Sequence, residues 1–455
     1  MDENQPSTSK DYHRNISYEI KDQILLRNDY EYLHKRTNKD GSDLWRCRKK
    51  NMCNATVKIL NQSIVHESNN HTHPPKNISE LTIESEMKLC LKNIQQNVTA
   101  PVSTIFEESI DRIKDKGLDL VTTIPLFENR KKTLYKKRNL ALGAKKIEFK
   151  KAVDIDIPKK YENLLFADYK HKNKRILILC NEEMLKYLSE SRHFFIDGTF
   201  KLCQKIFYQL YTMHADIGSN DSFFNVVPIL NILLPDKTRA TYEILFSLIK
   251  ARVPQWNPSK ISMDFEVSAI LALQSIIPGV KILGCFFHFT RCLWRKAKEL
   301  GVTKSKLGKV HVKLCSALSH LPQHLTAEGW LYIMEDCPRT KELTAFNDYF
   351  VNTWLENNIF STLWCSYGEE HTTNNIVEAW NNHVKKFLKP KPNIVQFLEG
   401  IRKDSIFYWK KLQTSTNISK RSPESRMIKE KITLTVQELL NDKISVGHCL
   451  EKLRF

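Results

Sequence analysis

RHFFIDGTFKL, at residues 192–202, opens the stretch of sequence that decides the fold. FYQLYTMHADIG (207–218) and FNVVPILNILLP (224–235) follow it after short turns, and all three runs are rich in β-branched and aromatic residues. Such runs favour β-strands, and short connections join strands that lie antiparallel. The stretch therefore predicts three consecutive antiparallel strands.

Helices and strands alternate after these three runs. Helices are predicted at 238–254, 267–279 and 288–301, and strands at 259–266 and 280–287. Three antiparallel strands, then a helix, then strands alternating with helices is the order of an RNase H-like sheet. Helices dominate residues 303–370, and an amphipathic helix is predicted over HTTNNIVEAWNNHVKKFL (371–388). The fold class is therefore α/β with a mixed sheet.

Two aspartates lie where such a sheet would place chemistry. Asp197 follows FFI at the end of a buried strand, with its carboxylate expected at the surface, and Asp264 ends the strand region ISMDFE. Neighbouring strand ends of an open sheet converge, and two carboxylates that meet there repel each other unless cations bind between them. Taken singly, each aspartate is better explained as an ordinary cap of a strand or turn.

Glu378 lies in the middle of one face of the helix predicted over 371–388. At 100° per residue that face is polar, and its members are Asn374, Asn375, Glu378, Asn382 and Lys385. A solvated glutamate is the plain interpretation. Three asparagines around one glutamate are nevertheless unusual for solubility alone, because asparagine is a mediocre helix former without charge.

A second pattern, near the N-terminus, consists of Cys47, Cys53, His71 and His73 within a 27-residue window. Zn²⁺ prefers a tetrahedral set of thiolates and imidazoles, and a small domain can fold around such a set without a large apolar core. The segments ATVKIL and QSIVHES between the two pairs alternate in polarity and predict a hairpin. A zinc site is favoured over a chance cysteine pair in a reduced core with its histidines in a turn.

The residues around these ligands resemble the FLYWCH-type zinc finger over about residues 15–75. That family places an aromatic-rich strand before Trp-x-Cys, then a second Cys, a hairpin and His-x-His. Tyr32 and Trp45 match its aromatic core positions. The strands would be 18–26, 29–37, 43–49, 55–60 and 62–68. The resemblance implies a small β-rich module with structural Zn²⁺ that binds DNA or protein.

Residues 190–390 resemble the Mutator-like (MULE) transposase domain, a DDE recombinase on an RNase H-like fold. The matching motifs are Asp197-Gly-Thr-Phe, Met-Asp264-Phe-Glu, Cys285-Phe-Phe-His288 and Asn374-Asn375-x-x-Glu378-x-Trp380-Asn381. The resemblance implies a catalytic triad of Asp197, Asp264 and Glu378 that holds Mg²⁺ or Mn²⁺, with an α-helical insertion before the glutamate. It also implies that Cys285 and His288 lie near the active site. A second zinc site there is less favoured, because no further Cys/His pair completes four ligands.

Composition favours a polyanionic partner. The 455 residues carry a net charge of +19, and residues 129–151 hold ten Lys and Arg residues against one Glu. This run, with Lys136, Lys137 and Arg138 at its centre, could contact nucleic acid, direct nuclear import or be a solvated helix face. The eleven cysteines are irregularly spaced and do not indicate a disulfide framework.

Four regions are expected along the chain. They are the zinc module (15–75), a helical basic linker or accessory DNA-binding region with helices at 79–94 and 102–116 (76–160), the α/β domain with a helical insertion at about 303–370 (161–410) and a C-terminal helical tail (411–455). The start of the chain lacks the apolar region of a secretory signal, and the longest apolar stretch is too short to span a bilayer.

Two classes of function remain open. One is a DDE transposase that cleaves and transfers DNA strands, and the other is a catalytically inactive nuclear DNA-binding regulator derived from a transposase. A C-terminal SWIM zinc motif, which many larger family members carry, is reduced here to the adjacent pair His448 and Cys449. DNA, including transposon terminal repeats, is the expected partner, and a homo-oligomer is left open. Neither a membrane nor a small-molecule substrate is expected, and the expected location is the nucleus.

Overall fold

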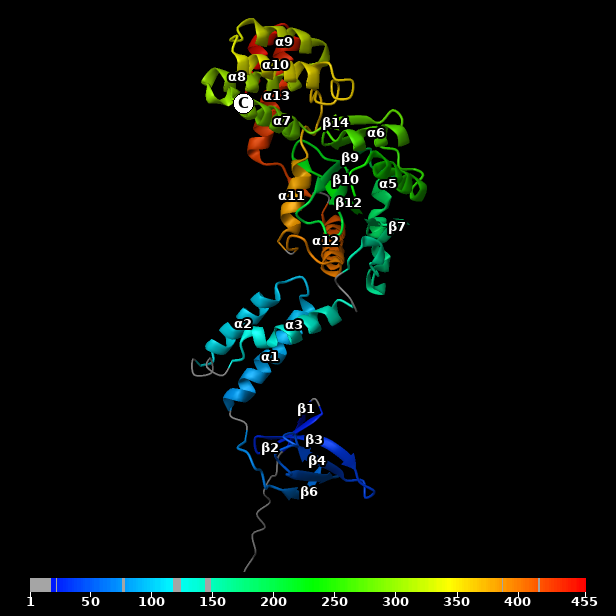
Figure 1. Ribbon diagram of the computed structural model, residues 1–455, viewed down its shortest axis with the longest axis vertical. Coiled ribbons are helices and arrows are strands. Elements are labelled where there is room, and N and C mark those ends of the chain that lie inside the picture. The colour runs from blue at the N-terminus through cyan, green and yellow to red at the C-terminus, as the bar shows by residue number, and fades with distance from the viewer. Residues whose placement is uncertain are drawn as a thin grey trace, which may run out of the picture. The chain divides into compact units, whose positions relative to one another are not determined.

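The computed structural model describes residues 18–21, 23–75, 78–117, 124–143, 149–386, 388–415 and 418–455. The chain divides into two compact units (Figure 1). The first consists of residues 1–96 and 101–135, and the second of residues 97–100 and 136–455. Among the described residues, the helices are all too short or too polar to cross a membrane.

The first unit begins with a six-stranded antiparallel sheet in which neighbours in sequence are neighbours in space. Its strands are β1 (Glu19–Lys21), β2 (Ile24–Arg27), β3 (Tyr30–Thr37), β4 (Asp43–Cys47), β5 (Thr56–Leu60) and β6 (Ser63–Ser68). The predicted strands that became β3 to β6 are confirmed. A single strand over 18–26 is wrong, because β1 and β2 form a hairpin whose turn contains Gln23 with a φ of 65°.

Helices complete the first unit. The predictions at 79–94 and 102–116 are confirmed as α1 (Ile78–Gln96) and α2 (Val102–Lys114), and α3 (Phe127–Ala141) carries part of the basic run and continues into the second unit. Glu86 of α1 is buried and forms ion pairs with Arg112 and Lys116 at 3.1 and 2.6 Å, which fasten α1 to α2. Residues 144–148 of the basic run lie outside the described residues.

The second unit is built on a seven-stranded mixed sheet in the order β14-β13-β9-β10-β12-β8-β7. The strands are β7 (Leu165–His171), β8 (Lys174–Leu179), β9 (His193–Thr199), β10 (Gln209–Asp216), β12 (Val226–Leu234), β13 (Lys260–Met263) and β14 (Lys281–Gly284). β7, β8, β12, β10 and β9 pair antiparallel, whereas β13 is parallel to both β9 and β14. The five strands predicted from residue 192 onward are confirmed, and β7 and β8 are additional.

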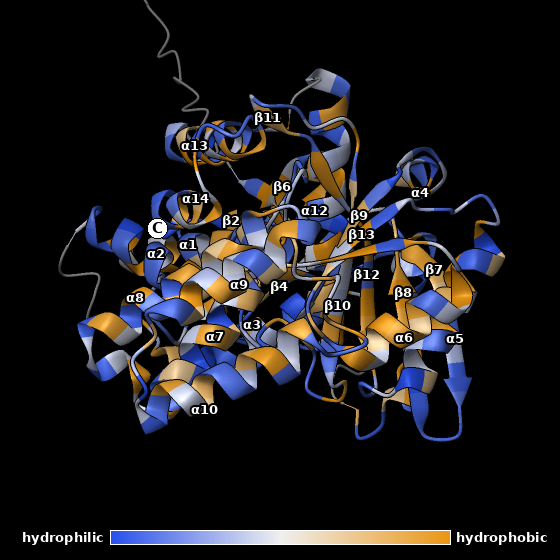
Figure 2. Cartoon of the chain, turned by 90° about the horizontal axis from the view of Figure 1, so that it is seen from above, coloured by the Kyte–Doolittle hydropathy of each residue, from blue (hydrophilic) through white to orange (hydrophobic). Residues whose placement is uncertain are grey.

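Helices cover both faces of this sheet (Figure 1). The covering helices are α5 (Arg239–Arg252), α6 (Val267–Ile276), α11 (Asn375–Val384) and α12 (Ile394–Thr414). Tyr211 and Met213 of β10 share a core with α5 and α6, whereas Leu210 shares a core with α12. All nine residues of β12 are buried, and seven of the nine are Val, Ile or Leu. Hydrophobic colour is accordingly prominent on the strands of this sheet (Figure 2).

A separate hydrophobic core joins the remaining large helices of the second unit. They are α7 (Phe286–Glu299), α8 (Lys306–Ala317), α9 (Thr326–Glu335), α10 (Lys341–Phe350), α13 (Pro423–Leu440) and α14 (Val446–Leu453). Phe289, Leu318, Phe346, Leu439 and Leu450 are among its buried members. The helices expected over 303–370 therefore pack together with the last two helices of the chain. The smaller elements are α4 (Lys186–Glu190) and the strand pair β11 (Phe223–Phe224) and β15 (Ser419–Lys420).

Candidate functional sites

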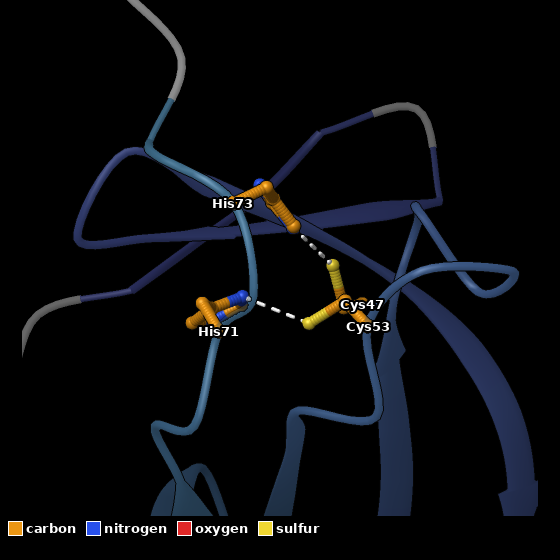
Figure 3. Close-up of side chains that lie close together, drawn as sticks. All are labelled: Cys47, Cys53, His71 and His73. Atoms are coloured by element: carbon orange, nitrogen blue, oxygen red, sulfur yellow. Dashed lines mark hydrogen bonds between the residues drawn. The ribbon is translucent and has the colours of Figure 1, made fainter.

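Four metal-type ligands gather at one end of the N-terminal sheet (Figure 3). Cys47 is the last residue of β4, Cys53 lies in the loop before β5, and His71 and His73 follow β6. Their ligand atoms all lie within 4.8 Å of one another, with Sγ of Cys47 3.2 Å from Nε2 of His73 and Sγ of Cys53 3.3 Å from Nδ1 of His71. Ligands on a zinc tetrahedron are roughly 3.5 Å apart, so the spacing fits Zn²⁺.

The second ring nitrogen of each histidine also has a partner. The hydroxyl of Tyr32 lies 2.8 Å from Nε2 of His71, and Nδ1 of His73 lies 2.9 Å from the carbonyl oxygen of Pro74. The ring of Tyr30 stacks on His71 with centroids 3.5 Å apart. Contacts of this kind fix the orientation of metal-bound histidines. The surroundings of the cluster therefore suit a structural metal site as well as the ligands do.

Protonation of the cluster fits the same conclusion. Burial and the neighbouring His73 lower the pKa of His71, so its imidazole is neutral at physiological pH. Burial raises the pKa of the Cys47 thiol; at Cys53 burial acts the same way but is outweighed by backbone hydrogen bonds from Ala55 and Thr72, which lower its pKa. The neutral imidazole of His71 and the thiolate favoured at Cys53 are the states in which these groups bind metal, and a bound cation would offset the raised pKa of Cys47.

The carboxylates predicted to act together in the second unit approach one another at the carboxyl ends of two neighbouring strands, β9 and β13. Asp197 lies on β9, Asp264 directly follows the adjacent parallel strand β13, and Glu378 lies on α11. Burial raises the pKa of Asp197 to about 7, and the negative charges of Asp264 and Glu378 contribute to the rise. Asp197 is only partly buried, so part of the residue stays at the surface, and burial is incomplete at this position.

Cys285 and His288 lie at the start of α7, close to the carboxyl ends of β9 and β13. Nδ1 of His288 lies 2.7 Å from Oδ1 of Asp264. Burial acts to lower the pKa of His288, but the interaction with Asp264 outweighs it and raises the pKa to about 10, so the imidazole is protonated at neutral pH. The Sγ atom of Cys285 accepts a hydrogen bond from the backbone N–H of Asn374 at 3.2 Å, which ties α7 to the segment before α11.

Asparagines attach α11 to β9. Asn381 donates its side-chain N–H to Oδ2 of Asp197 at 3.4 Å, and Asn374 donates to the backbone oxygen of Ile196 at 3.4 Å. The helix spans Asn375–Val384 rather than 371–388, and Asn374 is buried before its first turn. Asn374 is therefore not part of a solvated helix face. Its role was hidden because its partner on β9 is distant in sequence.

One contact at α11 was not anticipated from the sequence. The indole N–H of Trp380 on α11 donates to Oδ2 of Asp404 on α12 at 2.8 Å, and both residues are buried. Burial raises the pKa of Asp404 to about 7. Its signal in the sequence is an aspartate at a core position of α12, in helical spacing with the buried Phe397 and Ile401.

The three carboxylates do not form a closed ligand cluster. Among the described residues, the groups of three or more metal-type ligands with atoms all within 4.8 Å are the Cys/His cluster and a second group of two histidines and an aspartate. Asp197, Asp264 and Glu378 offer the hard oxygen atoms that Mg²⁺ and Mn²⁺ prefer. Their chemistry therefore fits a divalent metal, while Asp264 is occupied by His288.

Comparison with known proteins gives one family. No curated protein matches the chain. Residues 193–291, which carry Asp197, Asp264, Cys285 and His288 but not Glu378, match the family model of the MULE transposase domain.

Proposed function

We propose that the chain is a DNA-binding protein whose transposase-derived DDE domain cleaves and transfers DNA strands in a metal-dependent reaction. In this proposal Asp197, Asp264 and Glu378 form the catalytic triad. The N-terminal module is a FLYWCH-type zinc finger, and the protein acts on DNA in the nucleus. The match of residues 193–291 to the MULE transposase domain supports a transposase-derived function.

The observation that carries the proposal is that Asp197 on β9, Asp264 after β13 and Glu378 on α11 lie close enough together for their charges to affect the pKa of Asp197. Burial and the charges of two further carboxylates raise it to about 7. A carboxyl group perturbed in this way by burial and by specific neighbours is a candidate for a functional site. A divalent cation bound among the three carboxylates would relieve their repulsion and restore the ionised form of Asp197.

The order of the sheet supports an RNase H-like fold for the domain. β12, β10 and β9 are consecutive antiparallel strands, and β13 and β14 continue the sheet in parallel on the other side of β9. In this arrangement the carboxyl ends of β9 and β13 are neighbours. A site at these strand ends would be built from side chains of both strands. Asp197 near the end of β9 and Asp264 directly after β13 are placed to form it.

The residues of the chain would share the work of the reaction. Bound Mg²⁺ or Mn²⁺ supplies activation of the attacking hydroxyl and stabilisation of the leaving oxygen. Asp197, Asp264 and Glu378 would hold the metal ions. Asn381 would orient Asp197 through the hydrogen bond that its side-chain N–H donates, and His288 would orient Asp264. Lys and Arg side chains would bind the phosphate backbone by displacing its counterions.

The contact between His288 and Asp264 favours a second candidate function. A protonated imidazole 2.7 Å from the carboxylate competes with a metal ion for the same oxygen atom. A transposase-derived protein in which that contact persists would bind DNA without cutting it. This second candidate is a catalytically inactive nuclear DNA-binding regulator.

Strand cleavage by the Glu378→Gln variant tests the proposal. Glutamine keeps the size and helix propensity of glutamate but lacks the charge that would hold a cation. We expect the variant to lose Mg²⁺- or Mn²⁺-dependent nicking of DNA that carries the terminal repeats, while its DNA affinity stays close to that of the parent. Nicking is measured on gels and affinity by fluorescence anisotropy.

The matched control is Asp348→Asn, which removes one exposed carboxylate on α10 of the same unit. It should cut like the parent chain. Cleavage by Glu378→Gln at the parental rate would remove Glu378 from the triad. A parent chain that binds DNA and cuts none with either metal would favour the regulator.

A further inference from the structure

Two histidines and an aspartate meet at the end of the sheet opposite to Asp197. His193 is the first residue of β9, Asp216 is the last residue of β10, and His371 lies in the segment before α11. β9 and β10 are antiparallel, and Phe194 pairs with Ala215, so the first two residues come from adjoining strand ends. The ligand atoms of His193, Asp216 and His371 all lie within 4.8 Å of one another.

The carboxylate of Asp216 is held with one oxygen toward the histidines. Its Oδ1 accepts hydrogen bonds from the backbone N–H groups of Gly218 at 3.0 Å and Ser219 at 2.8 Å. Its Oδ2 lies 2.9 Å from Nε2 of His371. Hydrogen bonds to the outer oxygen of a carboxylate are the kind of support that orients a metal ligand.

The two histidines are held in a similar way. Nε2 of His193 lies 2.8 Å from the hydroxyl of Ser262, which engages one of its two ring nitrogens. The side chain of His371 is only 1% exposed, and its Nδ1 is buried without a hydrogen-bond partner among the described residues. The other nitrogen, Nε2, faces Oδ2 of Asp216 at 2.9 Å, so Nε2 is the atom of His371 that could bind an ion shared with that carboxylate.

The cations around the cluster have carboxylate partners of their own. Lys260 and Lys281 contact Glu369 at 2.7 and 2.6 Å, and Arg421 contacts Glu370 at 3.0 Å. Arg421 is close enough to interact electrostatically with Asp216, but its ion pair is with Glu370, and the hydrogen-bonded partner that Asp216 has among the histidines is His371.

We propose that His193, Asp216 and His371 bind a zinc-type divalent ion, as a second metal site distinct from the Cys/His cluster and from the carboxylates around Asp197. Two imidazoles and one carboxylate suit Zn²⁺ and related transition metals, whereas Mg²⁺ prefers oxygen ligands only. Three protein ligands leave one position for water. Of the three ligands, His371 also lines a cavity of about 900 Å³.

The ion would connect three parts of the second unit. It would join the start of β9 and the end of β10 to the segment that leads into α11. Two hydrogen bonds already tie that segment to the start of α7. The backbone N–H of Asn374 donates to Sγ of Cys285, and the carbonyl oxygen of Thr372 accepts from the backbone N–H of Phe286 at 2.8 Å. His371 is thus a positioning residue for α11, the helix that carries Glu378 and Asn381.

Zinc content of the full-length chain tests the proposal. We expect two zinc ions per chain by mass spectrometry of the metal, one in the Cys47→Ser/Cys53→Ser variant, one in the His371→Asn variant and none when the changes are combined. The control His171→Asn, which removes an exposed histidine at the end of β7, should keep two. A His371→Asn chain that keeps the parental zinc content would overturn the site.

A second measurement does not depend on whether a His371 variant folds. Cobalt(II) added to the Cys47→Ser/Cys53→Ser chain should give weak visible bands without the near-ultraviolet charge-transfer absorption of a cobalt–thiolate bond. This spectrum reports a site of nitrogen and oxygen ligands. Absence of any cobalt binding by that chain would leave Asp216 and His371 as a buried, metal-free ion pair and would refute the proposal.

Discussion

A single hydroxyl, that of Tyr32, joins the aromatic core of the N-terminal sheet to its metal cluster. Burial raises the pKa of Tyr32 well above its ordinary value, so the phenol stays protonated and can serve as a hydrogen-bond partner for Nε2 of His71. Because Nδ1 of His71 faces Cys53, the phenol fixes which nitrogen is presented to the metal.

Tyr32→Phe should therefore weaken zinc binding by roughly 10- to 100-fold, the usual effect of removing such a supporting hydrogen bond. Affinity is measured by competition with a chromophoric chelator. Tyr18→Phe is the control, because the hydroxyl of Tyr18 donates to the carbonyl of Gln62 at 3.0 Å and takes no part in the cluster. Equal affinities for the Tyr32→Phe chain and the parent would show that the phenol does not orient His71.

Site residues could be predicted from the sequence where metal-type ligands follow one another at a recognisable short spacing. Cys47, Cys53, His71 and His73 fall within one short window, and they do meet. The contact between Asp216 and His371 joins residues 155 positions apart, and neither position has a local pattern that points to the other. Pairings of that kind are decided by how strands and helices pack, which no short window of sequence records.

At the scale of elements, α11 is held in place by α12. The ring of Trp380 meets that of His214 of β10 edge-to-face, with ring centroids 5.3 Å apart, and its indole N–H donates to Asp404 on α12. Because Asp404 is buried with a pKa of about 7, the folded chain binds its proton more tightly than the unfolded chain does. Stability is therefore lost as the pH rises from about 4 to about 7.

Asp404→Asn should remove this dependence, because asparagine keeps an acceptor for Trp380 and has no charge to bury. Relative to the parent, the free energy of unfolding of the variant should increase between pH 4 and 7, by about 1.4 kcal/mol for each pKa unit of the shift. Urea unfolding at several pH values measures the difference, with Asp348→Asn as the exposed control. Parallel pH profiles for Asp404→Asn and parent would show that Asp404 is ionised in the folded chain.

The basic helix α3 offers a test of DNA binding. Lys136 and Lys137 are exposed, whereas Arg138 is buried, so the two lysines are the members of this trio that DNA can reach. Lys136→Gln/Lys137→Gln should reduce the slope of log affinity against log salt by roughly 0.9 for each phosphate that the variant no longer neutralises. Lys306→Gln/Lys309→Gln on α8 is the control with equal charge. If the α3 variant and the parent differ in DNA affinity but have the same salt slope, Lys136 and Lys137 do not bind phosphates.

Elements were predictable where the side-chain pattern repeats along a whole strand or helix. β9, β10 and β12 follow from long β-branched and aromatic runs, and α5 and α7 from apolar residues at helical spacing. β7 was not anticipated, because Asp168, Lys170 and His171 break up its apolar pattern, as is common in a strand at the edge of a sheet. The hairpin of β1 and β2 was missed because its tight turn depends on a left-handed backbone at Gln23, which sequence does not signal there.

At the scale of the whole molecule, the two compact units have separate cores. The N-terminal sheet buries only a few side chains around Tyr32 and Trp45, so we expect its stability to depend on metal bound at the Cys/His cluster. The second unit has its own sheet and three large cores. Loss of metal from the first unit should therefore leave the fold of the second intact.

Cys47→Ser should unfold the N-terminal sheet, because zinc binding supplies much of the folding free energy of so small a module. Hydrogen exchange should show reduced protection over residues 18–75 and parental protection over residues 193–291. His66→Asn, on β6 and outside the ligand set, is the control. Protection of residues 18–75 at the parental level in the Cys47→Ser chain would contradict the ligand assignment, and a reduction that spreads to residues 193–291 would contradict independent units.

The helical core of the second unit draws on residues from Phe289 to Leu453, and this has a consequence for biosynthesis. A ribosome releases α7 to α10 long before it has made α13 and α14. Until those last helices emerge, the nascent chain exposes the apolar surfaces around Leu318 that Leu439 and Leu450 later help to bury. A nascent chain is prone to aggregation while apolar surface is exposed because its packing partners have not yet been synthesised. Translation stopped before residue 423 should therefore release a chain that chaperones retain, although its central sheet has been fully synthesised.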